Sequence, residues 1–318
     1  MAPKRSQSRQ KALRQGGATA RPRSAEMAAP SAAGASTQAR RQPSRSYRKP
    51  KSFWRGPYPY LGILGAVLIV VLVVYAISRL TAGGTPQTGN FAEAVHNATN
   101  VSQSVFDEVG TGSLDSTKLP IQAIKSPTPL TGPDGKPEVL YMGGEYCPYC
   151  AADRWVMLTA LSRFGTFSGV QSMFSSSTDV YPNTPTFTFA NAKFSSQYVD
   201  FVPVEMYNRS QGALQTPTAQ QQQLMSTYDS GGGIPFLLIG GKFVGSTPFS
   251  PQDLAGKNQQ EVASSLSNSS QQTTQDIIGN ANLLTATICS ITNGEPSTVC
   301  QSPGVQKAGQ LLGISPSS

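Results

Sequence analysis

Cys147 and Cys150 are separated by two residues, in the sequence Cys-Pro-Tyr-Cys, at the junction of two segments with different periodicity. The apolar run 138–142 predicts a buried strand before them, and the periodicity of 152–161 predicts a helix after them. In that arrangement Cys147 is the N-cap, Pro148 takes the first helical position, and the Cys150 N–H points at the Cys147 sulfur. The helix dipole and this N–H favour the Cys147 thiolate, and Cys150 is close enough to form a disulfide. The pattern predicts a redox switch in an α/β fold.

Three interpretations of Cys147 and Cys150 are open: a redox-active pair, an inert structural disulfide, and half of a metal site. A zinc site needs about four ligands. His96, the single histidine, is distant in the sequence, and the gap between Cys289 and Cys300 is not a ligand spacing. The strand–Cys-x-x-Cys–helix context favours the redox-active pair, without a metal or another cofactor.

The segment Gly-Ile-Pro-Phe at 233–236 opens another apolar run. Together with Cys-Pro-Tyr-Cys, which is of the glutaredoxin type, it resembles the thioredoxin-like superfamily, in which a cis X-Pro bond opens a later strand. From about Val105 to Cys300 the pattern is similar to an uncharacterised prokaryotic family of membrane-anchored thioredoxin-like proteins, a domain of unknown function. The resemblance implies a thioredoxin-like fold.

The resemblance also implies roles for the residues of the site. Cys147 would be the nucleophile and Cys150 the resolving thiol. A cis bond before Pro235 would leave backbone groups free to pair with an extended peptide; the alternative is an ordinary proline that opens a strand. We expect the substrate to contact Ile234, Tyr149 and Pro148.

Two features depart from a minimal thioredoxin-like domain. The distance from Cys150 to Pro235 is 85 positions, so we expect an insertion at about 175–228 beside the active site, a position from which insertions can shape a substrate groove. Tyr141 occupies the strand position at which thioredoxins keep a buried carboxylate. Glu145 is the nearest acid, and it flanks the motif.

Charge divides the chain into two parts around an apolar segment. Residues 1–57 carry 14 Lys or Arg and one acid, whereas 81–318 carry 10 basic and 16 acidic residues. Residues 56–78 contain no charge, and a helix of that length crosses a hydrocarbon core of about 30 Å. A signal peptide would have a shorter apolar core and a cleavage site. We therefore expect a single transmembrane helix at 58–80, a cytoplasmic N-terminus and an extracytoplasmic C-terminal domain.

The composition of 1–57 predicts a disordered basic tail. Binding of anionic lipid or nucleic acid by this tail is the alternative, and nucleic acid is disfavoured because no nucleic-acid-binding fold is recognisable. Beyond the membrane helix we expect a linker and stalk helix at 81–113. A thioredoxin-like domain at 114–305 and a flexible C-terminus at 306–318 follow. The expected strands are 138–142, 170–174, 186–189, 199–206 and a hairpin of 234–239 with 242–244, and the expected helices include 216–228, one from Ser250, and 273–291.

Cys289 and Cys300 flank a turn, and we expect a structural disulfide that stabilises the fold by about 3 kcal/mol. A relay role is the alternative, disfavoured because neither cysteine has a helix N-terminus to lower its pKa. Together these features predict a membrane-anchored, extracytoplasmic thiol-disulfide oxidoreductase that acts on protein thiols or disulfides, with an unidentified electron donor or acceptor. The alternative is a non-catalytic binding module in which Cys147–Cys150 is a structural disulfide.

Overall fold

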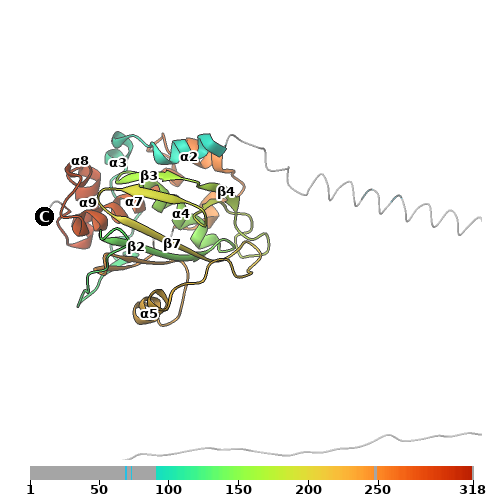
Figure 1. The fold of residues 1–318 in the computed structure, drawn as a ribbon. Helices are drawn as coiled ribbons and strands as arrows, with labels where there is room; N and C mark the ends of the chain where they lie inside the picture. The colour runs from blue at the N-terminus through green and yellow to red at the C-terminus, as the bar shows by residue number, and fades with distance from the viewer. Residues whose placement is uncertain (1–68, 70–72, 74–90, 247–248, 317–318) are drawn as a thin grey trace, which may run out of the picture. The chain divides into compact units, whose positions relative to one another are not determined.

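The computed structural model describes residues 69, 73, 91–246 and 249–316 of the 318-residue chain. From residue 91 onward these form a mixed α/β fold (Figure 1). The predicted tail 1–57 lies outside the described residues, and so does the predicted transmembrane helix 58–80 apart from Ile69 and Val73. Among the helices that the structure describes, none has the length and apolar character needed to cross a membrane.

A five-stranded mixed sheet in the order β1-β9-β8-β2-β7 forms the centre of the fold. β2 (Glu138–Gly144) runs parallel to β7 (Asp200–Tyr207) and antiparallel to β8 (Phe236–Ile239). β9 (Phe243–Gly245) pairs antiparallel with β8, and β1 (Ile121–Ala123) pairs with β9 at the edge. β2 is therefore an interior strand of the sheet, and the cysteine motif follows its C-terminal end.

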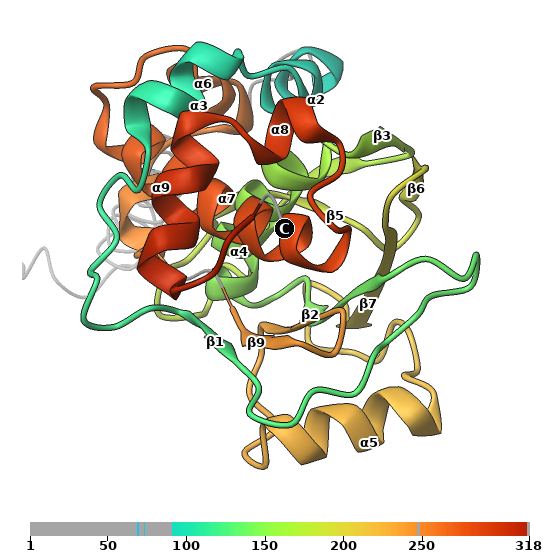
Figure 2. The ribbon, with the colours of Figure 1, turned by 90° about the vertical axis from the view of Figure 1, so that its left-hand side faces the viewer.

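Both faces of the sheet are covered, because β2 buries the side chains on both of its faces. Val139 and Tyr141 belong to the larger hydrophobic cluster, and Leu140 and Met142 to the smaller one. The covering helices are α4 (Pro148–Leu161) and α7 (Gln272–Ile291) on one face and α5 (Ala219–Tyr228) on the other (Figures 1 and 2). The apolar run of β2 thus reads as a continuous stretch, without the alternation of a half-exposed strand.

α4, which begins next to the cysteines, is buried along almost its whole surface. It packs against α7 and against β5 (Pro185–Thr188). Trp155 Nε1–H donates a hydrogen bond of 2.8 Å to the Pro185 carbonyl, and the Trp155 ring contacts Phe187 with centroids 4.5 Å apart. The N-terminus of α4 is consequently held in place by the core.

The structure confirms the predicted hairpin of 234–239 and 242–244. β8 pairs with β9, and Gly240 and Gly241 between them have φ of 58° and 67°, the left-handed region that a two-residue hairpin turn requires. The predicted helices at 216–228 and 273–291 appear as α5 and α7. The predicted strands at 170–174, 186–189 and 199–206 appear as β4 (Gln171–Phe174), β5 and β7.

The predicted insertion at 175–228 has the wrong bounds. β7 pairs with β2 in the central sheet, and α5 covers that sheet, so both belong to the main fold. Between α4 and β7 the chain instead forms two ribbons, β3 (Gly165–Ser168) with β6 (Lys193–Ser196), and β4 with β5. Periodicity predicts strands and not their partners, so the sequence alone does not place β7 in the sheet.

The predicted stalk at 81–113 is also corrected, because its described part packs into the domain. It contains two helices, α2 (Phe91–Thr99) and α3 (Gln103–Val109). Ala98 is fully buried and Phe106 is 2% exposed, and both join the larger hydrophobic cluster. The apolar spacing that predicted a helix here is the core-facing side of two short helices, which the structure joins to α6 (Gln259–Ser265) and α7.

The predicted flexible C-terminus at 306–318 is wrong for residues up to Leu312. α8 (Ser297–Cys300) and α9 (Pro303–Leu312) follow α7, and Val305 and Ala308 of α9 are fully buried against the core. Pro303 at the first turn and Gly313 at the end carried the helix signals. The helix predicted from Ser250 is one 3-10 turn, η2 (Pro251–Leu254).

Candidate active site

Cys147 and Cys150 lie at the N-terminus of α4, directly after the C-terminal end of β2. Cys147 is the N-cap, with extended backbone, and Pro148 occupies the first turn. The Cys150 N–H donates to the Cys147 sulfur at 3.2 Å, and the Cys147 thiol donates to the Ile234 carbonyl at 3.9 Å. Both cysteines are free thiols. Cys147 retains 6% exposure, whereas Cys150 is fully buried.

The two thiols have opposite electrostatic environments. The hydrogen bond with the Cys150 side chain, supported by the Cys150 N–H and by Arg154, lowers the pKa of Cys147 against the effect of its burial. Burial, followed by the interaction with Cys147, raises the pKa of Cys150 well above its usual value. Of the two, Cys147 is therefore the thiol that ionises first, and a thiolate is the nucleophilic form of cysteine.

A loop from a distant part of the sequence lies against Cys147. The Ile234–Pro235 bond is cis and directly precedes β8. A Cβ at Gly144 would approach the Ile234 side chain to 3.3 Å and the Tyr146 ring to 3.0 Å, so the glycine leaves room for both. The structure thus brings Ile234–Pro235 next to Cys147 and Cys150. Cys147 and Ile234 are 87 positions apart in the sequence.

A fully buried ion pair lies beneath the cysteines. Arg154 of α4 donates to both carboxylate oxygens of Glu205 on β7, through Nε at 2.8 Å and Nη2 at 2.7 Å. The Arg154 guanidinium carbon is 6.0 Å from the centre of the Tyr141 ring. Sequence reasoning singled out Tyr141 but missed the ion pair; the signal that pointed to it was the pair of charged residues at 153 and 154 inside a largely apolar helix.

Exposed apolar side chains occur in the cysteine motif and in the segments next to it. Within the described residues from 91 onward, five large apolar side chains are exposed, and four of them belong to this region: Tyr149, Val180, Tyr207 and Leu214. Two hydrogen bonds tie their segments to the turn before Cys147, from Ser176 N–H to the Tyr146 carbonyl and from Glu145 N–H to the Tyr207 carbonyl. The Tyr146–Tyr207 and Tyr149–Tyr181 rings meet edge to face. We call Tyr149, Val180, Tyr207 and Leu214 the apolar rim.

The other residues singled out in the sequence lie away from this site. His96 is exposed on α2. Cys289 at the end of α7 and Cys300 in α8 are joined by a disulfide, and both are fully buried. Groups of three or more side chains able to hold a metal ion do not occur among the described residues.

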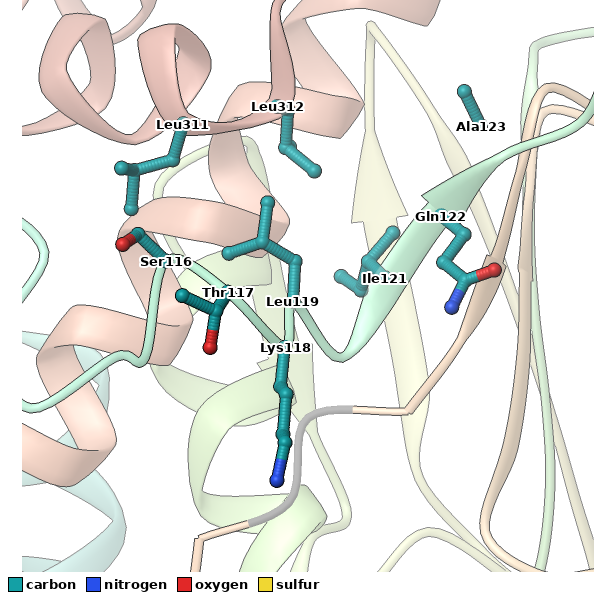
Figure 3. Close-up of a pocket in the computed structure, with 9 residues that line it drawn as sticks. All are labelled: Ser116, Thr117, Lys118, Leu119, Ile121, Gln122, Ala123, Leu311 and Leu312. Carbon is teal, nitrogen blue, oxygen red and sulfur yellow. The ribbon is translucent and has the colours of Figure 1, made fainter.

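The structure also has an open groove of about 560 Å³ at the edge strand β1 (Figure 3). Its lining consists of Ser116, Thr117, Lys118, Leu119, Ile121, Gln122, Ala123, Leu311 and Leu312. None of these is a cysteine or a neighbour of one in the sequence. We assign no chemistry to the groove, because Lys118 is its one charged lining residue and no acidic residue lines it.

Comparison with known proteins identifies a family and no characterised relative. No curated protein and no solved structure is significantly similar to the chain. The family described as Domain of unknown function (DUF929) matches residues 123–290, which is more than half of the chain. The matched stretch contains β2, α4, both free thiols and the Ile234–Pro235 bond. The chain therefore belongs to the family Domain of unknown function (DUF929).

Proposed function

We propose that this protein is a membrane-anchored, extracytoplasmic thiol-disulfide oxidoreductase that acts on protein thiols or disulfides. The observation that carries the proposal is the pair of free thiols at the start of α4. Cys147 has a lowered pKa and some exposure, and Cys150 has a raised pKa and none. A nucleophile and a resolving thiol need this division of properties.

We further propose that the domain is thioredoxin-like. In support, β2 and β7 are parallel strands with α4 between them in the sequence. The antiparallel hairpin β8–β9 and then α7 follow, and the strand order in the sheet is β9-β8-β2-β7. The cis Ile234–Pro235 bond next to Cys147 agrees with the superfamily pattern. On this reading, β3 to β6 are the insertion, and they supply Val180 and Tyr181 beside the site.

The proposed reaction is thiol-disulfide exchange. The Cys147 thiolate attacks one sulfur of a substrate disulfide, forming a mixed disulfide and releasing the other substrate sulfur as a thiolate that takes up a proton. Cys150 then loses its proton and attacks the Cys147 sulfur. This step closes the Cys147–Cys150 disulfide and releases the second substrate thiol, so two electrons pass to the substrate. The reverse sequence oxidises a substrate dithiol, and the redox partner sets the direction.

The apolar rim supports protein substrates over small disulfides. Its side chains range from 40% exposure at Tyr149 and Tyr207 to 72% at Val180. Isolated exposed apolar residues are ordinary, but their concentration around one reactive group is typical of a binding surface. An extended polypeptide with aliphatic or aromatic residues next to its cysteine would bury the side chains of the apolar rim.

A membrane anchor with the domain outside the cytoplasm is the part of the proposal that depends on the sequence alone. It is supported by the uncharged segment 56–78 and by the excess of basic residues before it and of acidic residues after it. In an oxidising compartment the Cys289–Cys300 disulfide would persist.

The test of this function is an equilibrium titration of the Cys147–Cys150 pair in glutathione redox buffers, followed by mass spectrometry of the alkylated protein. We expect the pair to change between dithiol and disulfide within the range of potentials that glutathione buffers cover. A disulfide that stays oxidised throughout this range would instead identify an inert structural bridge and a non-catalytic binding module.

A further inference from the structure

The ion pair of Arg154 and Glu205 is buried more deeply than stability requires. Both side chains have no exposure. Removing two charges from water costs several kcal/mol per ion, and well-packed apolar residues of similar volume often serve stability as well or better. A guanidinium stays protonated at any pH that the fold withstands. Arg154 is thus a permanent positive charge inside the core, and its position suggests what it acts on.

Arg154 lies on the same stripe of α4 as Cys150. The two residues are spaced i and i+4, which places their side chains one above the other along the helix, and Cys147 caps the N-terminus of that helix. Helical side chains lean toward the N-terminus, which for Arg154 is the end that carries the cysteines. The arginine is therefore directed at the thiols from within the core.

Glu205 occupies only part of the guanidinium. It accepts from Nε and Nη2 of Arg154, and its Oε1 also accepts from the Phe189 N–H at 3.4 Å. Arg154 Nη1 and Tyr141 Oη are buried and have no hydrogen-bond partner among the described residues. A Cβ at Gly143 would overlap Tyr141 Oη, so the phenol extends along β2 toward the cysteine end. Two unpaired donors thus remain in the core near the ion pair, and that of Tyr141 lies toward the cysteine end of β2.

We propose that Arg154, held in place by Glu205, is the positioning residue that keeps Cys147 as a thiolate and makes the cysteine pair a stronger oxidant. The inference deepens the proposed function and rests on it for its biological use. A cation near the thiols stabilises the reduced pair, because that pair contains a thiolate and the disulfide does not.

The electrostatic environment agrees with this assignment. The hydrogen bond with Cys150 is the largest influence that lowers the pKa of Cys147, and Arg154 adds to it. Burial raises the pKa of Cys150, and Arg154 opposes that rise. The other ionisable side chains around the motif include the phenols of Tyr141, Tyr146, Tyr149, Tyr181 and Tyr207 and the carboxyl groups of Glu145, Asp153, Asp179 and Glu205. Neutral phenols and acidic groups do not stabilise a thiolate. Arg209 is the cation of the neighbouring segment, but it is exposed and donates to the Ser175 carbonyl and to Asn183, so the buried stabilising charge is that of Arg154.

The test compares variants in a Cys150→Ser background, in which Cys147 is the one thiol outside the Cys289–Cys300 disulfide. The double substitution Arg154→Met with Glu205→Met removes the ion pair without leaving a buried unpaired charge. Arg154→Lys keeps a cation at the position. Arg163→Met is the matched control, because Arg163 is a largely buried arginine near the other end of α4, where it contacts Asn282 and Phe106. Circular dichroism establishes that each variant is folded.

Two readouts follow the thiolate: its ultraviolet absorbance against pH, and the rate of Cys147 alkylation by iodoacetamide at neutral pH. In the double variant we expect the absorbance to appear at higher pH and the alkylation rate to fall by up to about tenfold, because the loss of the Glu205 carboxylate offsets only part of the loss of the Arg154 cation. Arg154→Lys should stay near the parent and Arg163→Met should match it. With both cysteines present, the double variant should shift the glutathione equilibrium toward the disulfide by a similar factor, or about 30 mV for tenfold.

A folded double variant that titrates and alkylates like the parent would overturn the inference. If the double variant does not fold, Glu205→Gln provides the test, because it keeps the cation and removes its counter-charge. The thiolate absorbance must then appear at lower pH than in the parent. Absorbance that appears at the same or at higher pH refutes the role of Arg154. Thiol titration needs no substrate. A protein that fails the glutathione titration but shows these thiol shifts would therefore refute the proposed function and retain the assignment of Arg154 as the residue that stabilises the Cys147 thiolate.

Discussion

Cys147 and Cys150 are separated by less than one helical turn, yet their thiols lie in different environments. Cys147 accepts the N–H of Cys150 and borders the surface, whereas Cys150 is enclosed by the core. The N-cap position of Cys147 follows from the proline after it and the strand before it, so the sequence alone predicts this contact. The charge next to the thiols does not follow in the same way. Arg154 and Glu205 are 51 positions apart, and only the pairing of β2 with β7 brings Glu205 beneath α4.

A second titrating group lies at the opposite end of β2. Burial, with a contribution from the adjacent Asp200, raises the pKa of Glu138 to about 7. The folded state holds this proton more tightly than the unfolded chain. The stability that protonated Glu138 contributes is therefore complete below the usual glutamate pKa, and it is lost as the pH rises from there to about 7. Asp200 is itself bound by the Asp134 N–H and by Lys136, so it stays in place as the neighbouring charge.

Glu138→Gln should therefore raise the melting temperature above neutral pH, because the glutamine carries no charge that burial disfavours. At about pH 3 the variant and the parent should melt at nearly the same temperature, since Glu138 is then protonated in both states. Thermal melts across this pH range measure the difference. A difference that is constant with pH would show that Glu138 is not the titrating group.

At the scale of elements, the C-terminal helices complete the domain. α9 packs on α7 and α3, and the Cys289–Cys300 disulfide joins the end of α7 to α8. α7 in turn packs along α4. The disulfide and α9 therefore stabilise the position of α7, and α7 in turn stabilises that of α4, which begins at the thiols. It also explains why residues after Cys300 are folded, since Val305 and Ala308 bury against the same core.

Replacing both cysteines, Cys289→Ser with Cys300→Ser, should lower the free energy of unfolding by about 3 kcal/mol, because the short loop they close is released in the unfolded chain. The reduction potential of the Cys147–Cys150 pair should stay nearly unchanged, since neither serine lies in the motif. Denaturant unfolding and glutathione titration measure the two quantities. A substantial change of potential would assign Cys289 and Cys300 to an electron relay.

At the scale of the whole molecule, local patterns predicted the elements better than their assembly. The α/β class, the strand–motif–helix unit of β2 and α4, and the β8–β9 hairpin all follow from periodicity and turn residues within a few positions. The long-range contacts do not. α2 and α3 pack into the domain through Ala98 and Phe106, and β7 joins the central sheet, although nothing in either local pattern names the partner. The apolar rim likewise depends on how two loops return to the motif.

The charge distribution along the chain predicts the side of the membrane on which the thiols lie. In the variant without Cys289 and Cys300, a membrane-impermeant maleimide added to intact cells after reduction should label Cys147 as fully as in permeabilised cells. The reason is that the basic residues before the apolar segment favour the cytoplasm and leave the domain outside. Labelling that requires permeabilisation would place the domain in the cytoplasm.

The central claim is that Cys147 attacks the substrate and Cys150 resolves the intermediate. The most direct measurement is the capture of mixed disulfides, on non-reducing gels, by variants in which one of the two motif cysteines is replaced. In Cys150→Ser the resolving thiol is absent, so covalent complexes with protein substrates should accumulate and disappear with reductant. In Cys147→Ser the remaining thiol is buried with a raised pKa, so no complex should form. Equal capture by both variants, or capture by neither, would contradict the account.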